Sequence, residues 1–168
     1  FCAGFNLEEM AQAEEVAQAE AVGQDAPLFE HLVDTLEALP VPTIARLNGS
    51  LYGGAVDLAL ACDFRVGVHG MELRIPAARL GLHPYPNSLL RCASRLGLQV
   101  AKRLYLLAET LPAEELLRIG YLDALVDAAG LDAAVQAIAE PLHAGAPLAL
   151  RGMKLSLNEL ARGEFNLK

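Results

Sequence analysis

The sequence predicts a single domain of the α/β class, in which short strands alternate with helices in packed layers. Three observations predict it. The chain has 168 residues, 54% of them hydrophobic, and this is enough material for one buried core. Leu and Ala, both strong helix formers, supply most of the apolar residues, so much of the chain is expected to be helical. Short apolar segments of strand type separate the predicted helices, and that alternation is typical of layered α/β proteins.

The first forty residues are expected to form helix with one interruption. Residues 7–22 form either a polar helix with a thin apolar stripe or a mobile segment, and residues 23–27 interrupt it with Gly and Pro. Apolar side chains then recur at helical spacing from Leu28 to Leu39. This periodicity predicts an amphipathic helix that ends before Pro40.

The middle of the chain combines strands with a buried helix. Residues 43–47 are a short strand candidate, closed by an Asn-Gly turn. Gly53 and Gly54 open a nearly all-apolar run that ends at Cys62, so residues 53–62 are predicted to form a buried helix. A strand is expected to follow at residues 64–68.

The second half of the chain is more plainly helical. A short strand is expected at residues 124–126, and turn residues such as Gly97 and Pro112 separate the other elements. The predicted helices cover residues 88–96, 99–108, 113–119, 131–143 and 147–162.

Charge and hydropathy exclude two classes of partner. The formal net charge is −8, and residues 1–40 contain nine acidic residues and no Lys or Arg. An acidic segment repels phosphate, so no nucleic-acid partner is expected; a solvated helix face is the simplest interpretation, and a partner-binding tail is the alternative. Since no apolar run approaches the ~18 residues of a spanning helix, no membrane partner is expected either.

Cysteine and histidine spacing argues against a metal site. Cys2, Cys62 and Cys92 form no CxxC pair and are odd in number, which indicates reduced thiols of a cytoplasmic protein. The four histidines lie far apart without the spacing of a zinc site, so no metal is expected.

Two glycine-bearing turns are the most informative chemical features. Residues 1–5 read FCAGF where a strand is expected to end, and Gly53-Gly54 precedes the buried helix. Glycine allows a ligand to approach the backbone, and a helix N-terminus offers unpaired N–H groups. Two such N–H groups would form an oxyanion hole for a polarised carbonyl; tight packing is the alternative interpretation of either turn alone. Phosphate-binding and dinucleotide-binding loops are absent, and a triad of Ser50, a histidine and Asp57 has only composition in its favour.

Residues 1–7 and 48–65 resemble the two signature stretches of the crotonase (enoyl-CoA hydratase/isomerase) superfamily. The similarity continues in order through residues 74–76, 80–81 and 120–126 and the helix that contains Lys154.

The resemblance implies a crotonase-like ββα spiral with a helical C-terminal part. Residues 1–168 would form one domain, with the spiral core in residues 1–110 and a helical trimerisation region in residues 111–168. The family's N-terminal strands and last C-terminal helix have no counterpart here, and the sequence does not begin with Met. We therefore expect it to be an incomplete chain.

The same resemblance implies an acyl-CoA-processing enzyme, a lyase or isomerase of fatty acid metabolism, that stabilises a thioester enolate. The backbone N–H groups of Phe5 and Gly54 would hold the thioester oxygen. No cofactor is implied beyond coenzyme A as part of the substrate, and the assembly would be a homotrimer or a dimer of trimers. The implied substrate-binding residues are Ala3, Phe5, Gly53, Gly54, Ala77 and Leu82.

The chain departs from the family at the acid–base positions. Family hydratases carry two glutamates, and Asp57 stands at the first position as the catalytic carboxylate. Ala77 follows Pro76 at the second position, where it can neither accept nor donate a proton, so ordinary hydration is doubtful.

The turn after Gly81 supplies two further catalytic candidates, His83 and Tyr85. It loosely resembles the turn of decarboxylase members of the superfamily; a rigid loop with a packed Tyr is the alternative. Nearby, Arg74 and Arg79 are candidates for binding a substrate carboxylate, with solvated arginines as the alternative. A hydratase/isomerase, a decarboxylase-type member and a catalytically weakened CoA-binding or assembly protein all remain open.

Overall fold

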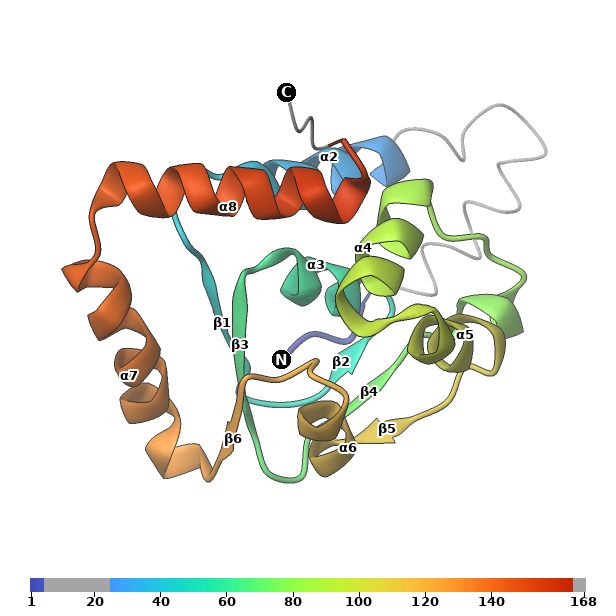
Figure 1. Cartoon of the computed structure of the whole chain (residues 1–168). Coiled ribbons are helices and arrows are strands. Elements are labelled where there is room, and N and C mark those ends of the chain that lie inside the picture. The colour runs from blue at the N-terminus through green and yellow to red at the C-terminus, as the bar shows by residue number, and fades with distance from the viewer. Residues whose placement is uncertain (5–24, 165–168) are drawn as a thin grey trace.

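The computed structural model describes residues 1–4 and 25–164 (Figure 1), so the prediction for residues 7–22 lies outside the described residues. In chain order the elements are α2 (Asp25–Ala38), β1 (Ile44–Arg46), β2 (Leu51–Tyr52), α3 (Gly54–Ala61), β3 (Phe64–Val68), β4 (Glu72–Arg74), the 3-10 helix η1 (Ala77–Leu80), α4 (Pro86–Leu96), α5 (Leu98–Leu106), β5 (Leu111–Pro112), α6 (Ala113–Arg118), β6 (Ala124–Val126), the 3-10 helix η2 (Ala128–Gly130), α7 (Leu131–Ala144) and α8 (Pro147–Arg162).

Two helices begin earlier than their periodicity predicted. α2 begins at Asp25, inside the segment predicted to interrupt helix, and α4 begins at Pro86 rather than at residue 88. In each case a proline lies within the first turn, where it needs no intrahelical hydrogen bond and its fixed φ suits the helix. The prolines therefore start these helices instead of separating them.

The strands form two three-stranded sheets. One has the order β1-β3-β6 and is entirely parallel, with Val66 opposite Ala124 in the register of β3 and β6. The other has the order β2-β4-β5, in which β2 and β4 are parallel and β4 and β5 antiparallel. The strands predicted at residues 64–68 and 124–126 are confirmed, and β1 is confirmed in shortened form. β2, β4 and β5 were not predicted, because two or three residues are too few to show alternation.

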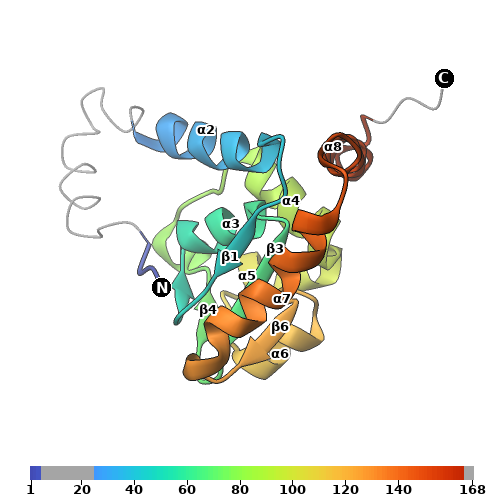
Figure 2. The same cartoon turned by 90° about the vertical axis from the view of Figure 1, so that its left-hand side faces the viewer.

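Helices cover both sheets and enclose one core. α7 packs on β1, β3 and β6, and Figure 2 shows it crossing in front of that sheet. α3 lies on the opposite side of that sheet from α7 and packs against α2 and α4 (Figure 1). Residues after position 110 supply β5 and β6, so both sheets are completed by the later part of the chain. The largest fully buried side chains include Tyr121, Leu47, Leu51, Leu60, Leu73 and Leu104.

An ion pair joins the middle of α8 to the segment between α3 and β3. Lys154 of α8 is 8% exposed; its Nζ donates to the Val41 carbonyl at 2.9 Å and to Asp63 at 2.7 Å. Asp63 lies between α3 and β3 and also accepts hydrogen bonds from the N–H and hydroxyl of Thr43. This set of contacts ties the C-terminal helix to the entrance of β1.

The three cysteines carry free thiols. Burial, then the charge of Asp57, raises the pKa of the Cys92 thiol to about 12. Over the described residues, no helix combines the length and apolar character needed to cross a bilayer.

Candidate active site

The two glycine-bearing segments meet beside β2. The Cys2 N–H donates to the Ser50 carbonyl at 3.3 Å, and the Tyr52 N–H donates to the Cys2 carbonyl at 3.1 Å. Gly4 follows with a φ of 86°, and a Cβ at this position would lie 2.7 Å from the Tyr52 carbonyl oxygen. Only glycine fits this approach, so the packing of the first turn against the second is direct. Phe5, the predicted first oxyanion donor, lies outside the described residues.

The second turn presents the N-terminus of α3. Gly53 caps the helix with φ 58° and ψ −127°, a conformation that residues with a Cβ rarely adopt. Its N–H donates to the Arg74 carbonyl at 3.0 Å, which fixes the turn to the end of β4. Among the described residues none accepts a hydrogen bond from the Gly54 N–H. That donor is therefore available at the positive end of the helix dipole.

Asp57 lies one turn further along α3 and is 4% exposed. Both of its carboxylate oxygens accept hydrogen bonds from Nη1 of Arg91, at 2.8 Å each. The Tyr85 hydroxyl donates a short hydrogen bond to Oδ2. The carboxylate is thus fully engaged, and it is paired with a cation as a buried charge must be.

Arg91 connects this carboxylate to the N-terminal helix. Its guanidinium, 2% exposed, also donates to Asp34 at 2.7 Å and to Glu37 at 3.1 Å, both on α2. Burial alone would lower the pKa of Arg91, but the carboxylates of Asp57 and Glu37 raise it. The side chain therefore remains a cation that contacts three carboxylates.

Sequence reasoning missed Arg91. A signal was present: Asn87, Arg91 and Arg95 recur every four residues on α4, while Asp34 and Glu37 are three apart on α2. Such spacings place each set on one helix face. Which faces meet is decided by the packing of the helices.

Tyr85 immediately precedes α4, and this position turns its half-buried ring toward α3. Burial, followed by the negative charge and the hydrogen bond of Asp57, raises the pKa of Tyr85 well above its usual value. The hydroxyl is consequently neutral, and it donates its hydrogen bond to Asp57. The structure thus brings together two of the predicted catalytic residues, Asp57 and Tyr85.

The other predicted residues lie around this centre. Ala77 and Leu82 mark the two ends of the η1 turn, where the Leu82 N–H donates to the Ala77 carbonyl at 2.9 Å. His83 is exposed, as are Ala3 and Arg79.

Two further residues considered from the sequence have different surroundings. Arg74 is half-buried, and its Nε has no hydrogen-bond acceptor in the described part of the chain. The Ser50 hydroxyl accepts a hydrogen bond from the Glu72 N–H at 3.1 Å, and no bond to Asp57 or to a histidine is found among the described residues. A serine triad therefore has no geometric support.

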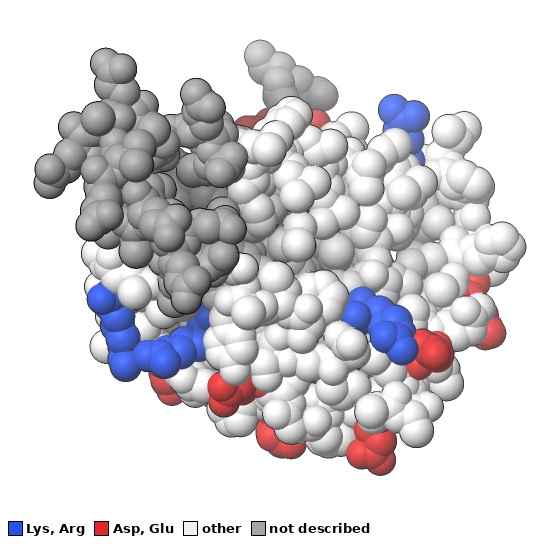
Figure 3. Space-filling model, turned by 180° about the vertical axis from the view of Figure 1, so that it is seen from behind, with Lys and Arg blue, Asp and Glu red and all other residues white. Residues whose placement is uncertain are grey.

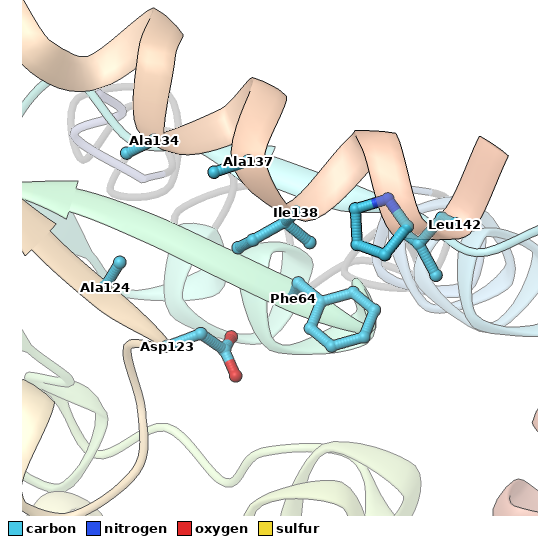
Figure 4. A pocket seen from close by; sticks show the side chains of 8 residues that line it. Phe64, Asp123, Ala124, Ala134, Ala137, Ile138 and Leu142 are labelled. Atoms are coloured by element: carbon cyan, nitrogen blue, oxygen red, sulfur yellow. The ribbon is translucent and has the colours of Figure 1, made fainter. Parts of the chain in front are cut away.

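Two hollows are found among the described residues, and neither is lined by Gly54, Asp57 or Tyr85. One, of about 470 Å³, separates α7 from β3 and β6, and Figure 4 shows Phe64, Ile138 and Leu142 facing it. It contains none of the predicted site residues. The other, of about 320 Å³, lies between α2, α4 and α8 and is lined by Asp34, Glu37 and Arg91 among others. It opens onto the outer side of the Arg91 ion pairs.

The rear face of the molecule is mostly uncharged (Figure 3). Basic side chains are scattered over the described part of this face, and acidic side chains lie mainly along its lower and right-hand edges. A continuous basic stripe, the usual footprint of nucleic-acid binding, is not formed here by the described residues.

Together, these features place an available N–H at the start of α3, one turn before a buried carboxylate that contacts Tyr85 and Arg91. A model of the enoyl-CoA hydratase/isomerase family matches residues 1–165, and the chain belongs to that family. The predicted crotonase-type fold is thereby confirmed. An enoyl-CoA hydratase from Polaromonas sp. has a similar structure, with a TM-score of 0.85 and 29% identity, over 96% of this chain and 62% of that chain.

Curated relatives include enzymes with different substrates. An enoyl-CoA isomerase/hydratase of Mycosarcoma maydis is 33% identical over 97% of this chain and 60% of its own length. A mitochondrial methylglutaconyl-CoA hydratase of Mus musculus is 30% identical over 95% of this chain and 51% of its own length. The chain thus spans 51 to 60% of the length of these two relatives.

Proposed function

We propose that the protein processes acyl-CoA thioesters by stabilising an enolate of the thioester. The observation that carries this proposal is the contact of the two glycine turns, with Gly4 against Tyr52 and the Gly54 N–H available at the start of α3. The Gly54 N–H and the N–H of Phe5 hold the thioester oxygen as negative charge develops on it. Loss of one such donor costs roughly 3–4 kcal/mol of transition-state stabilisation in comparable sites.

The proton-transfer unit in this proposal is Tyr85 together with Asp57. Asp57 accepts hydrogen bonds from both Arg91 and Tyr85, so it orients the tyrosine more readily than it removes a proton from substrate. Tyr85 donates its proton to the enolate carbon. This role starts from a neutral hydroxyl, and the raised pKa of Tyr85 means that the phenolate left behind must be stabilised once the proton has moved.

A decarboxylase-type reaction is the second candidate, and Ala77 is the observation that favours it. Hydration needs a base to activate water as well as a proton donor, and Ala77 leaves the second acid–base position empty. Decarboxylation needs only that the C–C bond electrons move into the thioester as carbon dioxide leaves. Tyr85 then protonates the resulting enolate carbon.

A panel of acyl-CoA thioesters assayed with the full-length protein tests this function. Crotonyl-CoA reports hydration, methylmalonyl-CoA reports decarboxylation, and acetoacetyl-CoA reports enolate binding through the absorbance of its enolate. We expect an enolate signal with acetoacetyl-CoA and turnover of at least one other thioester. Tight binding without turnover would instead identify a CoA-binding or assembly protein, and absence of both would contradict the proposal.

The proposed assembly is a homotrimer or a dimer of trimers. Several apolar side chains along α8 are exposed, and this supports burial of the helix in an interface between subunits. They are Leu148, Met153, Leu155, Leu157 and Leu160. Sedimentation of the full-length protein as a strict monomer at micromolar concentration would contradict it. A cytoplasmic location and a place in fatty acid metabolism remain predictions from the resemblance.

A further inference from the structure

Arg91 makes more ionic contacts than any catalytic candidate, although no sequence motif pointed to it. One nitrogen, Nη1, contacts both oxygens of Asp57, while Nη2 and Nε contact Asp34 and Glu37 on α2. The guanidinium is 2% exposed and the Asp57 side chain 5%, whereas the Asp34 side chain is 34% exposed. Arg91 thus has an inner contact with the buried carboxylate of Asp57 and outer contacts with the more exposed carboxylates of Asp34 and Glu37.

The inner contact determines the geometry of the tyrosine. A carboxylate held at both oxygens by one guanidinium nitrogen cannot rotate freely, so its Oδ2 stays where the Tyr85 hydroxyl reaches it. The outer contacts restrain the guanidinium itself, because Asp34 and Glu37 hold its other two nitrogens. The position of α2 is therefore transmitted to the hydroxyl through two side chains.

The charge of Arg91 matters as well as its geometry. When Tyr85 gives its proton to an enolate, a phenolate forms beside the Asp57 carboxylate, and two negative charges then lie within hydrogen-bond distance. In a buried site such repulsion is weakly screened. Arg91 is the cation that offsets it, consistent with its opposing the rise of the Tyr85 pKa.

We propose that Arg91 is a positioning residue of the active site, which fixes Asp57 as the acceptor for Tyr85 and offsets the charge of deprotonated Tyr85. This inference rests on the proposed enolate chemistry. Arg91 does not touch substrate in this arrangement. Its substitution is therefore expected to change kcat and to leave KM nearly unchanged.

The test compares Arg91→Met, Arg91→Lys and the double variant Asp57→Asn/Arg91→Met in the full-length protein, with the thioester that gives the highest turnover. Arg91→Met is expected to lower kcat about 10²-fold, the cost of misplacing a catalytic group by ~1 Å, with KM changed less than about threefold. Arg91→Lys keeps the charge and is expected to recover at least about tenfold of that loss. The double variant removes the buried Asp57 charge together with Arg91, while Glu37 keeps its pairing with Arg95 and the Asp34 side chain is 34% exposed. It therefore provides a second variant to measure should Arg91→Met fail to fold.

A double-mutant cycle separates positioning from an independent role. If Arg91 acts through Asp57, the double variant is expected to lose no more kcat than the worse single variant. The proposal would be overturned if the fold-losses in kcat of the two single variants multiplied in the double variant, or if Arg91→Met left kcat unchanged. Arg103→Met is the matched control, since Arg103 likewise pairs with more than one carboxylate, Glu109 and Glu115. The kcat of this variant is expected to match that of the wild type.

The acetoacetyl-CoA enolate signal distinguishes this inference from the proposed function. Arg91→Met is expected to retain that signal, because the hydrogen bonds of Arg91 go to Asp34, Glu37 and Asp57 and none reaches the described residues of the glycine turns. If the wild type itself gives neither signal nor turnover, the enolate function and the role of Arg91 are both wrong. If the wild type is active and Arg91→Met is equally active, only the role of Arg91 is wrong.

Discussion

Asp57 and Arg91 are 34 positions apart in the chain, yet both oxygens of the carboxylate lie 2.8 Å from the same guanidinium nitrogen. The pair is almost entirely shielded from water, and Tyr85 completes the set of groups around the carboxylate. A carboxylate in these surroundings is a fixed acceptor. Arg91 therefore holds the carboxylate in place, and Tyr85 donates to it.

Asp57→Asn is expected to lower kcat by at least ~10²-fold, the lower end for acid–base catalysis, while the affinity for coenzyme A stays nearly intact. The amide carries no charge and replaces one acceptor oxygen with an NH2 donor, so Arg91 loses its buried anionic partner and one of its two contacts with this side chain. Steady-state kinetics with the best thioester measure the effect. Asp63→Asn is the control, because Asp63 also pairs with a buried cation, Lys154, and its loss is expected to lower stability alone. Unchanged turnover in Asp57→Asn would remove Asp57 from the mechanism.

Tyr85→Phe is expected to lower kcat by about 10²–10⁴-fold, since it removes the proposed proton donor. The free energy of unfolding is expected to fall by only about 1 kcal/mol, because Asp57 keeps its hydrogen bonds from Arg91. Kinetics and urea denaturation measure the two effects. Tyr105→Phe removes a hydroxyl that bonds with Ser88 and is expected to affect stability only. If both variants retain wild-type kcat, another group protonates the enolate.

Gly4→Ala tests the contact between the glycine turns. The added Cβ would lie 2.7 Å from the Tyr52 carbonyl oxygen, so the backbone around the proposed oxyanion hole must shift. We expect the acetoacetyl-CoA enolate signal to weaken about 10²-fold, in line with displacement of one donor. Gly70→Ala has a similar positive φ but no atom within 4 Å of its Cβ, and is expected to cost about 1 kcal/mol of stability without affecting the signal. Equal signals in both variants would contradict an oxyanion hole at this contact.

Ala77→Glu tests whether the missing second carboxylate limits hydration. Ala77 begins η1 and is only partly exposed, so a glutamate here adds an acid–base group at the position implied by the family resemblance. Hydration of crotonyl-CoA is expected to rise above the wild-type rate. Ala78→Glu places the same charge on the neighbouring exposed residue and is expected to leave that rate unchanged. A folded Ala77→Glu variant without gain would favour the decarboxylase-type reaction.

Local sequence was sufficient for much of the helical framework. Periodic apolar residues predicted the described helices from α3 to α8 within about two residues at each boundary, since a helix face reads directly from spacings of three and four. The same reasoning misplaced the start of α2, where Pro27 lies in the first turn instead of before the helix. Proline alone does not distinguish a helix break from a helix start.

The sequence by itself determined the two glycine turns, the carboxylate Asp57 and the absence of a carboxylate at Ala77, because each depends only on which residue stands at a position. Tertiary structure alone decided that Asp57 is paired with Arg91 and Tyr85, and that Arg91 also reaches Asp34 and Glu37. Burial and electrostatic pairing act through space, and their partners here come from α2, α3, α4 and the turn before α4. Tertiary structure also decided the short strands β2, β4 and β5, because each is stabilised by the strand it pairs with rather than by its own few residues.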